Sequence, residues 1–319
     1  MIISASRRTD IPAFFGEWFI NRIRAEEVLV RNPVNPSMIT RIPLTPDSVD
    51  CFVFWTKDPS GFTDALDLLD EKGFTYYFQF TLTAYDRRIE KDVARKRDLL
   101  NTFRTLSDRI GPERVVWRYD PVLFTRDLTA EYHMRWFDVL AAELAGYTEE
   151  CIFSFLQEYG KIEENMRRLG VRLPGMEERR GFAGGLARIA ARRGLILSSC
   201  AQPDDFGDLG IRRSRCIDPD RIGWITGRDV PGRKDPSQRK ECGCAVSRDM
   251  GTYNTCLHNC LYCYANRDSA EILRRAGGYD PRSPLLCDVL KGNEQVRDLK
   301  IPGLASAAAE AAGQMELFV

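Results

Sequence analysis

The sequence lacks three features that would assign the chain to a class of protein at once. No apolar run approaches the roughly 20 residues of a membrane span, so we expect no membrane association. The net charge is +0, from 46 basic and 46 acidic residues, so no global field draws the chain to nucleic acid or to a membrane surface. The opening MIISASRRTDIPAFF has no basic start followed by a long apolar run, which predicts no signal peptide and a cytoplasmic protein.

Internal repeats and low-complexity linkers are also absent from the 319 residues, a length that allows one large domain or two ordinary ones. We expect residues 1–202 to form the core of the fold. Residues 203–319 form a cysteine-rich region that completes the core, because this region holds too little apolar sequence for a core of its own. Its tail, ASAAAEAAGQMELFV, has high helix propensity and is expected to fray.

Strand and helix patterns alternate from residue 1 to about residue 200. Between the predicted strands, apolar residues recur three and four positions apart, as in amphipathic helices. Six short, nearly continuous apolar runs are typical of strands buried on both faces, and they cover residues 1–6, 51–57, 75–83, 114–122, 151–157 and 195–201. This alternation predicts parallel βαβ units, arranged as an open doubly wound sheet or as a barrel.

Nearly every predicted strand ends in polar residues, at the edge where α/β folds build their ligand sites. A strand end can also turn polar simply because it leaves the core, but six such ends favour one shared mouth. A buried lysine without a purpose is costly, which makes Lys57 a catalytic candidate. Arg118 and Asp120 are catalytic candidates too, although a structural salt bridge between them is an equal alternative. The candidates for cofactor binding are Ser6, Asp10, Gln79, Thr81, Ser154 and Gln157.

The sequence contains 10 cysteines, and in a reducing compartment clustered thiols indicate metal or redox chemistry. Cys256, Cys260 and Cys263 lie in the stretch CLHNCLYC, which we call the triad. Three thiolates can bind three irons of a cubane and leave the fourth iron open to a small chelating ligand. A zinc site that adds His258 or Cys244 is the alternative. We expect His258 to be an exposed loop residue rather than a ligand.

The triad spacing, with the aromatic Tyr262 before its last cysteine, resembles that of the radical S-adenosylmethionine superfamily. The resemblance implies a [4Fe-4S] cluster on the triad, S-adenosylmethionine on its open iron, and reductive cleavage to a 5′-deoxyadenosyl radical that abstracts hydrogen from a substrate. It places the backbone of Tyr262 against the adenine. It also implies an electron donor such as a flavodoxin or ferredoxin.

In that superfamily the triad follows the first strand of a (β/α)6 partial barrel, whereas here it follows the alternating units. We therefore expect a circularly permuted partial (β/α)6 TIM-like barrel of parallel strands, with the cysteine-rich third packed at the barrel mouth. Its first strand would lie within residues 244–255. The adjacent termini of such barrels permit permutation.

Several segments carry a closer resemblance. SASRRTDIPAFFGEW, FWTKDP, FQFTLTAYDRRIE and RYDPVL resemble, in order, segments of the spore photoproduct lyase branch. Together with DMGTYNTCLHNCLYCYAN they resemble an uncharacterised bacterial family, domain of unknown function 1848, whose carboxyl-terminal cysteine cluster is similar to that of the radical enzymes. No substrate comes with this resemblance, so a nucleic-acid lesion, a peptide and a small metabolite all stay open.

Four further cysteines, Cys200, Cys216, Cys242 and Cys244, fall in the same third of the chain, and we call them the quartet. Four thiolates would complete a second [4Fe-4S] cluster or a zinc site. The alternative is that Cys200 is buried as a small apolar residue and the others are incidental. For the whole protein, the alternatives to a radical enzyme are a zinc-stabilised binding protein and an iron–sulfur electron-transfer protein.

Overall fold

The protein is described by a computed structural model that covers residues 1–157, 160–230 and 232–299. The tail for which the sequence predicts a fraying helix, residues 305–319, lies outside the described residues. Within the described residues no helix is both long enough and apolar enough to cross a bilayer.

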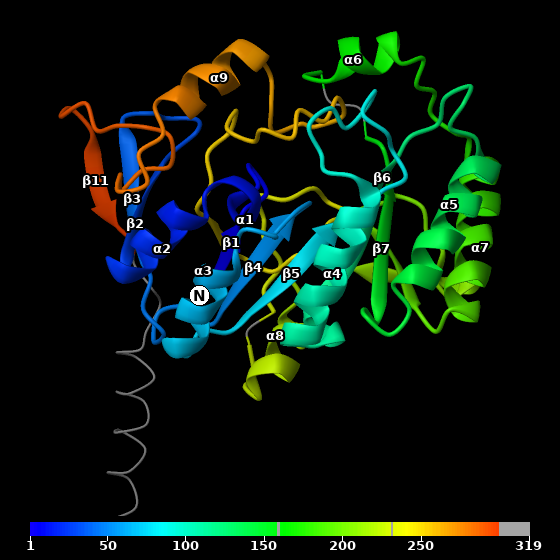
Figure 1. Ribbon diagram of the computed structural model, residues 1–319, viewed down its shortest axis with the longest axis horizontal. Coiled ribbons are helices and arrows are strands. Elements are labelled where there is room, and N and C mark those ends of the chain that lie inside the picture. The colour runs from blue at the N-terminus through cyan, green and yellow to red at the C-terminus, as the bar shows by residue number, and fades with distance from the viewer. Residues whose placement is uncertain (158–159, 231, 300–319) are drawn as a thin grey trace, which may run out of the picture.

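One large sheet of eight strands forms the centre of the molecule (Figure 1), and every pair of neighbouring strands in it is parallel. Its order is β10–β1–β4–β5–β6–β7–β8–β9. The strands are β1 (Ile2–Ala5), β4 (Cys51–Thr56), β5 (Tyr76–Thr81), β6 (Val115–Val122), β7 (Glu150–Phe155), β8 (Ile196–Cys200), β9 (Arg212–Ser214) and β10 (Arg248–Asp249). The six predicted strands and the predicted α/β class are confirmed.

The last of these strands in the chain pairs with the first. β10 lies within residues 244–255, where the sequence predicts a strand, and it pairs with β1 through Ile3 and Arg248. In the described residues β10 and β9 are the two edges of the sheet, so the hydrogen-bonded ladder is open.

Helices surround the sheet, with α3 and α4 in front of the strands, α5 and α7 at one end and α8 below them (Figure 1). Each presents an apolar stripe to the sheet, as Leu99, Phe103 and Leu106 do on α4. The described helices are α1 (Ile11–Phe14), α2 (Gly16–Arg24), α3 (Thr63–Glu71), α4 (Lys96–Ile110), α5 (Ala130–Glu143), α6 (Glu163–Arg168), α7 (Met176–Arg192), α8 (Pro219–Thr226) and α9 (Ser269–Gly277), with short 3-10 turns at Pro112–Arg114 and Gly207–Leu209.

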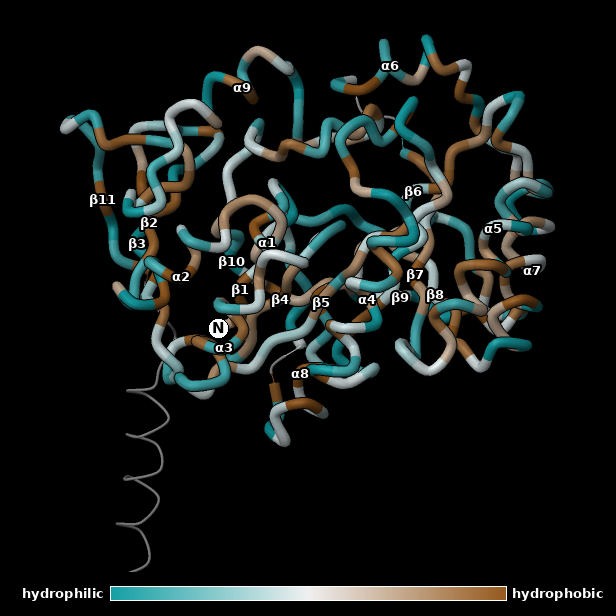
Figure 2. The backbone as a smooth tube through the Cα atoms, viewed as in Figure 1, coloured by the Kyte–Doolittle hydropathy of each residue, from teal (hydrophilic) through white to brown (hydrophobic). Residues whose placement is uncertain are grey.

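The two faces of the sheet are buried by different parts of the chain. Alternate residues such as Phe52 and Phe54 join the large cluster formed with the helices. The residues between them, such as Cys51 and Val53, form a second cluster with Cys216, Cys244 and other residues of the cysteine-rich third. Apolar residues therefore stand next to one another over much of the strands, and Figure 2 shows brown stretches in the central sheet that polar residues interrupt. Cys51 and Cys151 are fully buried, as expected of core residues.

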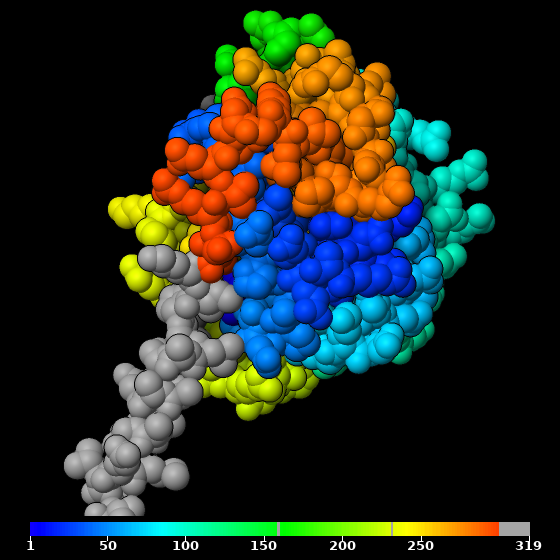
Figure 3. All heavy atoms as spheres, turned by 90° about the vertical axis from the view of Figure 1, so that its left-hand side faces the viewer, coloured from blue at the N-terminus to red at the C-terminus, as the bar shows by residue number. Residues whose placement is uncertain are grey.

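A second, smaller sheet was not anticipated from the sequence. It has the order β11–β3–β2, with β2 (Glu27–Arg31) antiparallel to β3 (Met38–Pro43) and β11 (Gln295–Asp298) parallel to β3. In Figure 3 the orange and red carboxyl-terminal segment lies over the blue amino-terminal elements. Its strand β11 is exposed at every position, so no apolar alternation marks it in the sequence.

Candidate functional site

The triad loop follows β10 and lies along the segment that follows β5. The backbone of Cys260 forms an isolated antiparallel bridge with that of Glu90. The Leu261 amide donates to the Ile89 carbonyl at 3.0 Å, and the Asp92 amide donates to the His258 carbonyl at 3.2 Å. The three cysteines are therefore held at the carboxyl end of the parallel sheet, the edge at which the sequence predicts the site.

The three triad thiols differ from the other seven cysteines in their exposure. Cys256, Cys260 and Cys263 are partly exposed, and the other seven are buried. Their environment is nevertheless deep enough that burial raises the pKa of all three thiols, that of Cys260 to about 12 even though the nearby Lys57 ammonium lowers it. Binding a metal would therefore release protons from these thiols.

A buried carboxylate beside Cys260 binds four side chains. Glu90 is 1% exposed, and it accepts hydrogen bonds from Lys57 Nζ at 2.7 Å and from Lys96 Nζ at 2.5 Å. It also accepts from the hydroxyls of Thr83 and Tyr262. Burial alone would raise the pKa of Glu90, but the two ammonium groups hold it well below its ordinary value. Sequence reasoning missed Glu90, because only the fold brings the end of β4 beside the segment after β5.

Lys57, a predicted catalytic residue, is the principal ionic partner of Glu90. Burial opposes its charge, but Glu90 raises the pKa of Lys57 above its ordinary value, so the ammonium stays charged. It also lies 5.7 Å from the centre of the Tyr262 ring. The structure thus explains why this lysine is tolerated at a strand end, and its catalytic role stays a prediction.

The prediction that His258 is an exposed loop residue is wrong, because the residue is only 4% exposed. Its Nε2 lies 2.9 Å from Asp10 Oδ2, and its ring packs edge-on against Phe14. Asp10, predicted to bind a cofactor, also caps α1 through the Ala13 amide and accepts from the Lys57 amide at 2.7 Å. Asp10 therefore joins the ends of β1 and β4 to the triad loop.

Ser6, another predicted cofactor contact, connects β1 to β10. Its hydroxyl donates to Asp249 Oδ1 at 2.6 Å, and the Ser4 hydroxyl and the Arg7 amide donate to Asp249 Oδ2. A side chain at Gly251 would meet the Ser6 hydroxyl at 2.1 Å, so only glycine permits this close approach. Asp249, which sequence reasoning missed, thus aligns the strand that leads into the triad.

The remaining predicted side chains form a polar row on the face of the sheet that the quartet covers. Arg118 pairs with Asp120, which also accepts from Ser154, so the alternative of a structural salt bridge is present. Arg118 also donates to Gln79 Oε1 at 3.1 Å and to Cys216 Sγ at 2.9 Å.

Two further candidates lie at strand ends. Gln157 Nε2 donates to the Ala201 carbonyl at 3.0 Å, across the ends of β7 and β8. Thr81 is half-buried at the end of β5. None of these contacts tests a role in cofactor binding, so both residues stay predictions.

The quartet lies beneath this row. Cys200 Sγ and Cys216 Sγ are 3.3 Å apart, and all four residues are buried. As their side chains stand, the described residues contain no group of three or more histidine, cysteine, aspartate or glutamate side chains arranged to hold a metal ion. The triad and the quartet are therefore candidate donor sets rather than formed metal sites.

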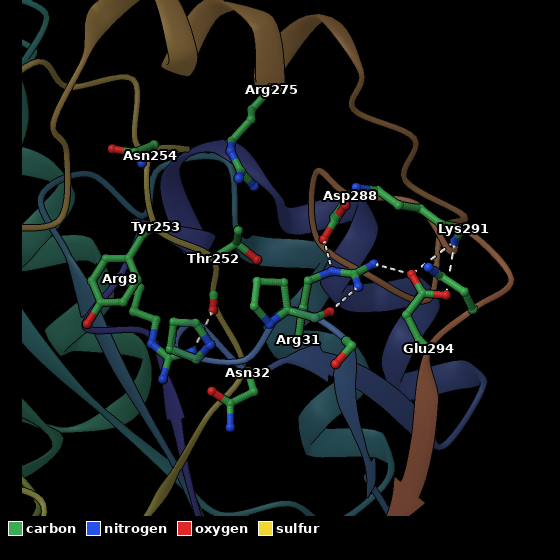
Figure 4. A pocket seen from close by; sticks show the side chains of 15 residues that line it. Arg8, Arg31, Asn32, Thr252, Tyr253, Asn254, Arg275, Asp288, Lys291 and Glu294 are labelled. Atoms are coloured by element: carbon green, nitrogen blue, oxygen red, sulfur yellow. Dashed lines mark hydrogen bonds and ion pairs between the residues drawn. The ribbon is translucent and has the colours of Figure 1, made fainter.

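A polar cavity of about 450 Å³ opens beside the segment that leads into the triad (Figure 4). Residues 251–254, Arg8 and Arg275 line it on one side, and the small sheet with residues 288–294 lines it on the other. Arg31 is held by Asp288 and Glu294, so it builds the wall. Arg8 lies 5.2 Å from the ring centre of Tyr253. Sequence reasoning did not anticipate this cavity, because it did not anticipate the small sheet that completes it.

Comparison with known proteins bears on the family only. A family model described as domain of unknown function (DUF1848) matches residues 2–265, a segment that contains both the triad and the quartet. No curated protein and no solved structure matches the chain.

Proposed function

We propose that this chain, which belongs to the DUF1848 family, is a radical S-adenosylmethionine enzyme that holds a [4Fe-4S] cluster on Cys256, Cys260 and Cys263. The observation that carries the proposal is the position of the triad loop. Residues that follow β1, β4 and β5 bind this loop at the carboxyl ends of parallel strands, where α/β enzymes place their cofactors.

The donor set of the loop fits an incomplete thiolate cradle. Three thiols within eight residues would bind three irons, and no fourth cysteine lies in the stretch 256–263. Two buried polar atoms of the same loop, His258 Nδ1 and Asn266 Oδ1, have no hydrogen-bond partner among the described residues. Unsatisfied buried polar atoms are rare and are a feature of sites that receive a ligand.

When bound, the cluster supplies the electron that cleaves the sulfonium bond of S-adenosylmethionine. The chain's own residues orient and protect that chemistry. Glu90 fixes Lys57 and Tyr262 beside Cys260, and the Lys57 ammonium favours negative charge on that sulfur. Asp10 and His258 hold the other side of the loop against β1.

The pairing of β10 with β1 supports the permuted arrangement. In space, the triad follows the strand at the edge of the sheet, and β1, β4, β5, β6, β7 and β8 come after it in order. In the chain, the same strand comes last among the strands of the large sheet. We therefore propose a permuted partial barrel in which the triad keeps its place after the first strand in space.

The polar cavity is the candidate route to the substrate, since residues 251–254 line it and Cys256 lies two residues further along the chain. Its volume lies within the range of small-molecule sites, which suits a metabolite, one residue of a peptide or a single nucleotide of a lesion. We propose an external electron donor such as a flavodoxin or ferredoxin.

The test is anaerobic purification with iron and sulfide quantitation, followed by chemical reduction with S-adenosylmethionine and assay of 5′-deoxyadenosine. We expect product from the native chain and a loss of at least about 100-fold in Cys256→Ser, Cys260→Ser and Cys263→Ser, since each removes a cluster ligand. Cys287→Ser, a buried cysteine outside both groups, is the matched control. An iron-loaded chain that cleaves no S-adenosylmethionine would refute the enzyme, and zinc without iron would favour the zinc-stabilised binding protein.

A further inference from the structure

We infer that the quartet of Cys200, Cys216, Cys242 and Cys244 is a tetrathiolate metal centre, separate from the triad, with Arg118 as its buried counter-cation. The inference does not depend on the proposed radical chemistry. It rests on how the fold brings these four thiols together and on the groups that surround them.

The four thiols come from three separate segments of the chain and belong to one buried cluster. Cys200 ends β8, Cys216 follows β9, and Cys242 and Cys244 precede β10. Cys200 Sγ lies 3.3 Å from Cys216 Sγ. Cys244 Sγ lies 3.4 Å from the amide nitrogen of Ile217, the residue that follows Cys216, and Cys242 is two residues from Cys244 in the chain.

The distance between the Cys200 and Cys216 sulfurs approaches the one expected between two ligands of a metal site. Four sulfurs around a zinc ion at the usual bond length of about 2.3 Å lie about 3.8 Å from one another. As the side chains stand, the four thiols are not arranged around a common point that could hold a metal ion, so metal binding would require them to turn toward one another.

The backbone holds both loops against the sheet at the required places. The Cys216 carbonyl accepts from Tyr77 Oη at 2.6 Å and from Gln79 Nε2 at 3.1 Å, both on β5. The Cys244 carbonyl accepts from the Asp235 amide at 2.9 Å. Between Cys242 and Cys244, a side chain at Gly243 would meet Arg215 at 2.9 Å, so the close approach of these loops favours glycine there.

The polar groups that face the thiols distinguish the quartet from ordinary apolar packing. The Arg118 guanidinium is buried, and it donates to Cys216 Sγ at 2.9 Å. The Ile217 amide donates to Cys244 Sγ at 3.4 Å. A neutral thiol is a weak acceptor, whereas a metal-bound thiolate accepts such bonds well and needs positive charge nearby when it is buried.

The donor set also selects the class of metal. Four thiolates are soft ligands, which prefer zinc or an iron–sulfur cluster over magnesium, calcium or manganese. A tetrathiolate site has no open position, so we assign the quartet a structural or electron-storing role rather than a substrate-binding one. The centre would join β8, the loop after β9 and the segment that leads into β10.

The test uses the full chain with Cys256→Ser, Cys260→Ser and Cys263→Ser combined, so that any metal retained belongs to the quartet. We expect about one zinc, or about four irons with matching sulfide, per chain after anaerobic purification. Adding Cys242→Ser and Cys244→Ser should lower that content at least about tenfold, since two of four ligands are then lost. Cys51→Ser and Cys287→Ser are the matched controls and should retain the metal.

If the variants that lack quartet cysteines fail to fold, a second measurement tests the inference. Cobalt(II) added to the triad-free chain after removal of its native metal should give the absorption of tetrahedral thiolate coordination, with affinity reduced about 10- to 100-fold in Arg118→Gln and largely restored in Arg118→Lys. The inference is overturned if the triad-free chain binds no metal and shows four reactive thiols. It is also overturned if Cys200 and Cys216 are joined in a disulfide.

Discussion

The triad and the quartet are two groups of thiols that the chain assembles in opposite ways. The triad lies within eight residues of sequence, partly exposed, on a loop held by charged and hydrogen-bonded side chains. The quartet is drawn from residues 200–244, is buried, and belongs to an apolar cluster on one face of the sheet. Local spacing therefore suffices to identify the triad, whereas the quartet is defined only after the sheet has formed.

The difference also indicates what each group depends on. The triad loop is bound at its sides by Glu90 and Asp10, whose contacts are electrostatic. The quartet depends on the packing of two loops against β5 and β8. Substitutions that remove charge should therefore disturb the triad most, and substitutions that loosen the packing should disturb the quartet most.

The largest effect is expected from Glu90→Gln, which leaves the ammonium groups of Lys57 and Lys96 without their carboxylate. Removal of one partner of a buried ion pair costs about 3–5 kcal/mol, so the free energy of unfolding should fall by about that amount. Chemical denaturation followed by circular dichroism measures it. Glu164→Gln, in an exposed pair, should cost less than about 1 kcal/mol. Equal effects of the two variants would contradict the charge dependence of the triad loop.

The free energy of unfolding should fall at acid pH because of His133, a residue outside both the triad and the quartet. Burial lowers the pKa of His133 to about 4, and its ring nitrogens bond to Tyr119 and to the Leu123 carbonyl. Between pH 6.5 and 4 the unfolded chain takes up a proton that the folded chain does not, so the free energy of unfolding falls as pH falls. The loss reaches about 3 kcal/mol, from 1.36 kcal/mol per pKa unit.

This acid dependence is measured by urea denaturation at several pH values from 7 to 4. His133→Gln cannot take up the proton, so its stability should change less over the same range, even if it is lower throughout. If the stability of the native chain does not change between pH 6.5 and 4, the pKa of His133 is not lowered in the folded protein. The comparison distinguishes unfolding caused by protonation of His133 from loss of metal caused by protonation of the thiols.

Asp10→Asn, which weakens a contact of the triad loop, should lower the free energy of unfolding by an intermediate amount. The amide replaces one acceptor oxygen that serves His258 and the Lys57 amide, which should cost about 1–3 kcal/mol. A double-mutant cycle with His258→Gln should give a coupling energy of at least about 0.5 kcal/mol. Additive effects of the two substitutions would show that Asp10 does not hold the triad loop through His258.

The smallest effect is expected from Tyr77→Phe on the quartet side. The change removes the hydroxyl that donates to the Cys216 carbonyl and accepts from the Asp218 amide, at a cost of about 1 kcal/mol. Tyr76→Phe is the matched control, because its hydroxyl bonds to Asp70 instead. Both should lose similar stability, but only Tyr77→Phe should speed the release of metal from the quartet to a chelator. Equal rates of metal release from the two variants would show that the hydroxyl of Tyr77 on β5 does not help to hold the quartet.

Parts of the fold were predictable because they obey local rules. The six strands read as continuous apolar runs since both faces of the parallel sheet are covered, as the burial of Phe52 and Val53 shows. The strand β10 was placed from the triad that follows it. The small sheet was missed, because β11 is polar and exposed and pairs with β3 from far along the chain.

The candidate site was predictable only in part. Lys57 was selected because burial of an unpaired lysine is costly, and it does lie in a buried ion pair. Its partner Glu90 ends the segment FQFTLTAYDRRIE that resembles the spore photoproduct lyase branch, but it was not chosen as a candidate, since nothing in the residues near it marks that carboxylate as buried. His258 was misplaced for the same reason, because the Asp10 that binds it is far away in the chain.

The sequence by itself determined the family, the parallel α/β class and the triad spacing, because each depends only on neighbouring residues or on short periodic patterns. Only the tertiary structure decided that Glu90 lies beside Cys260, that Asp10 holds His258 and that Arg118 faces Cys216. The physical reason is distance along the chain. A contact between side chains far apart in sequence follows from the packing of the sheet as a whole, and no local pattern encodes it.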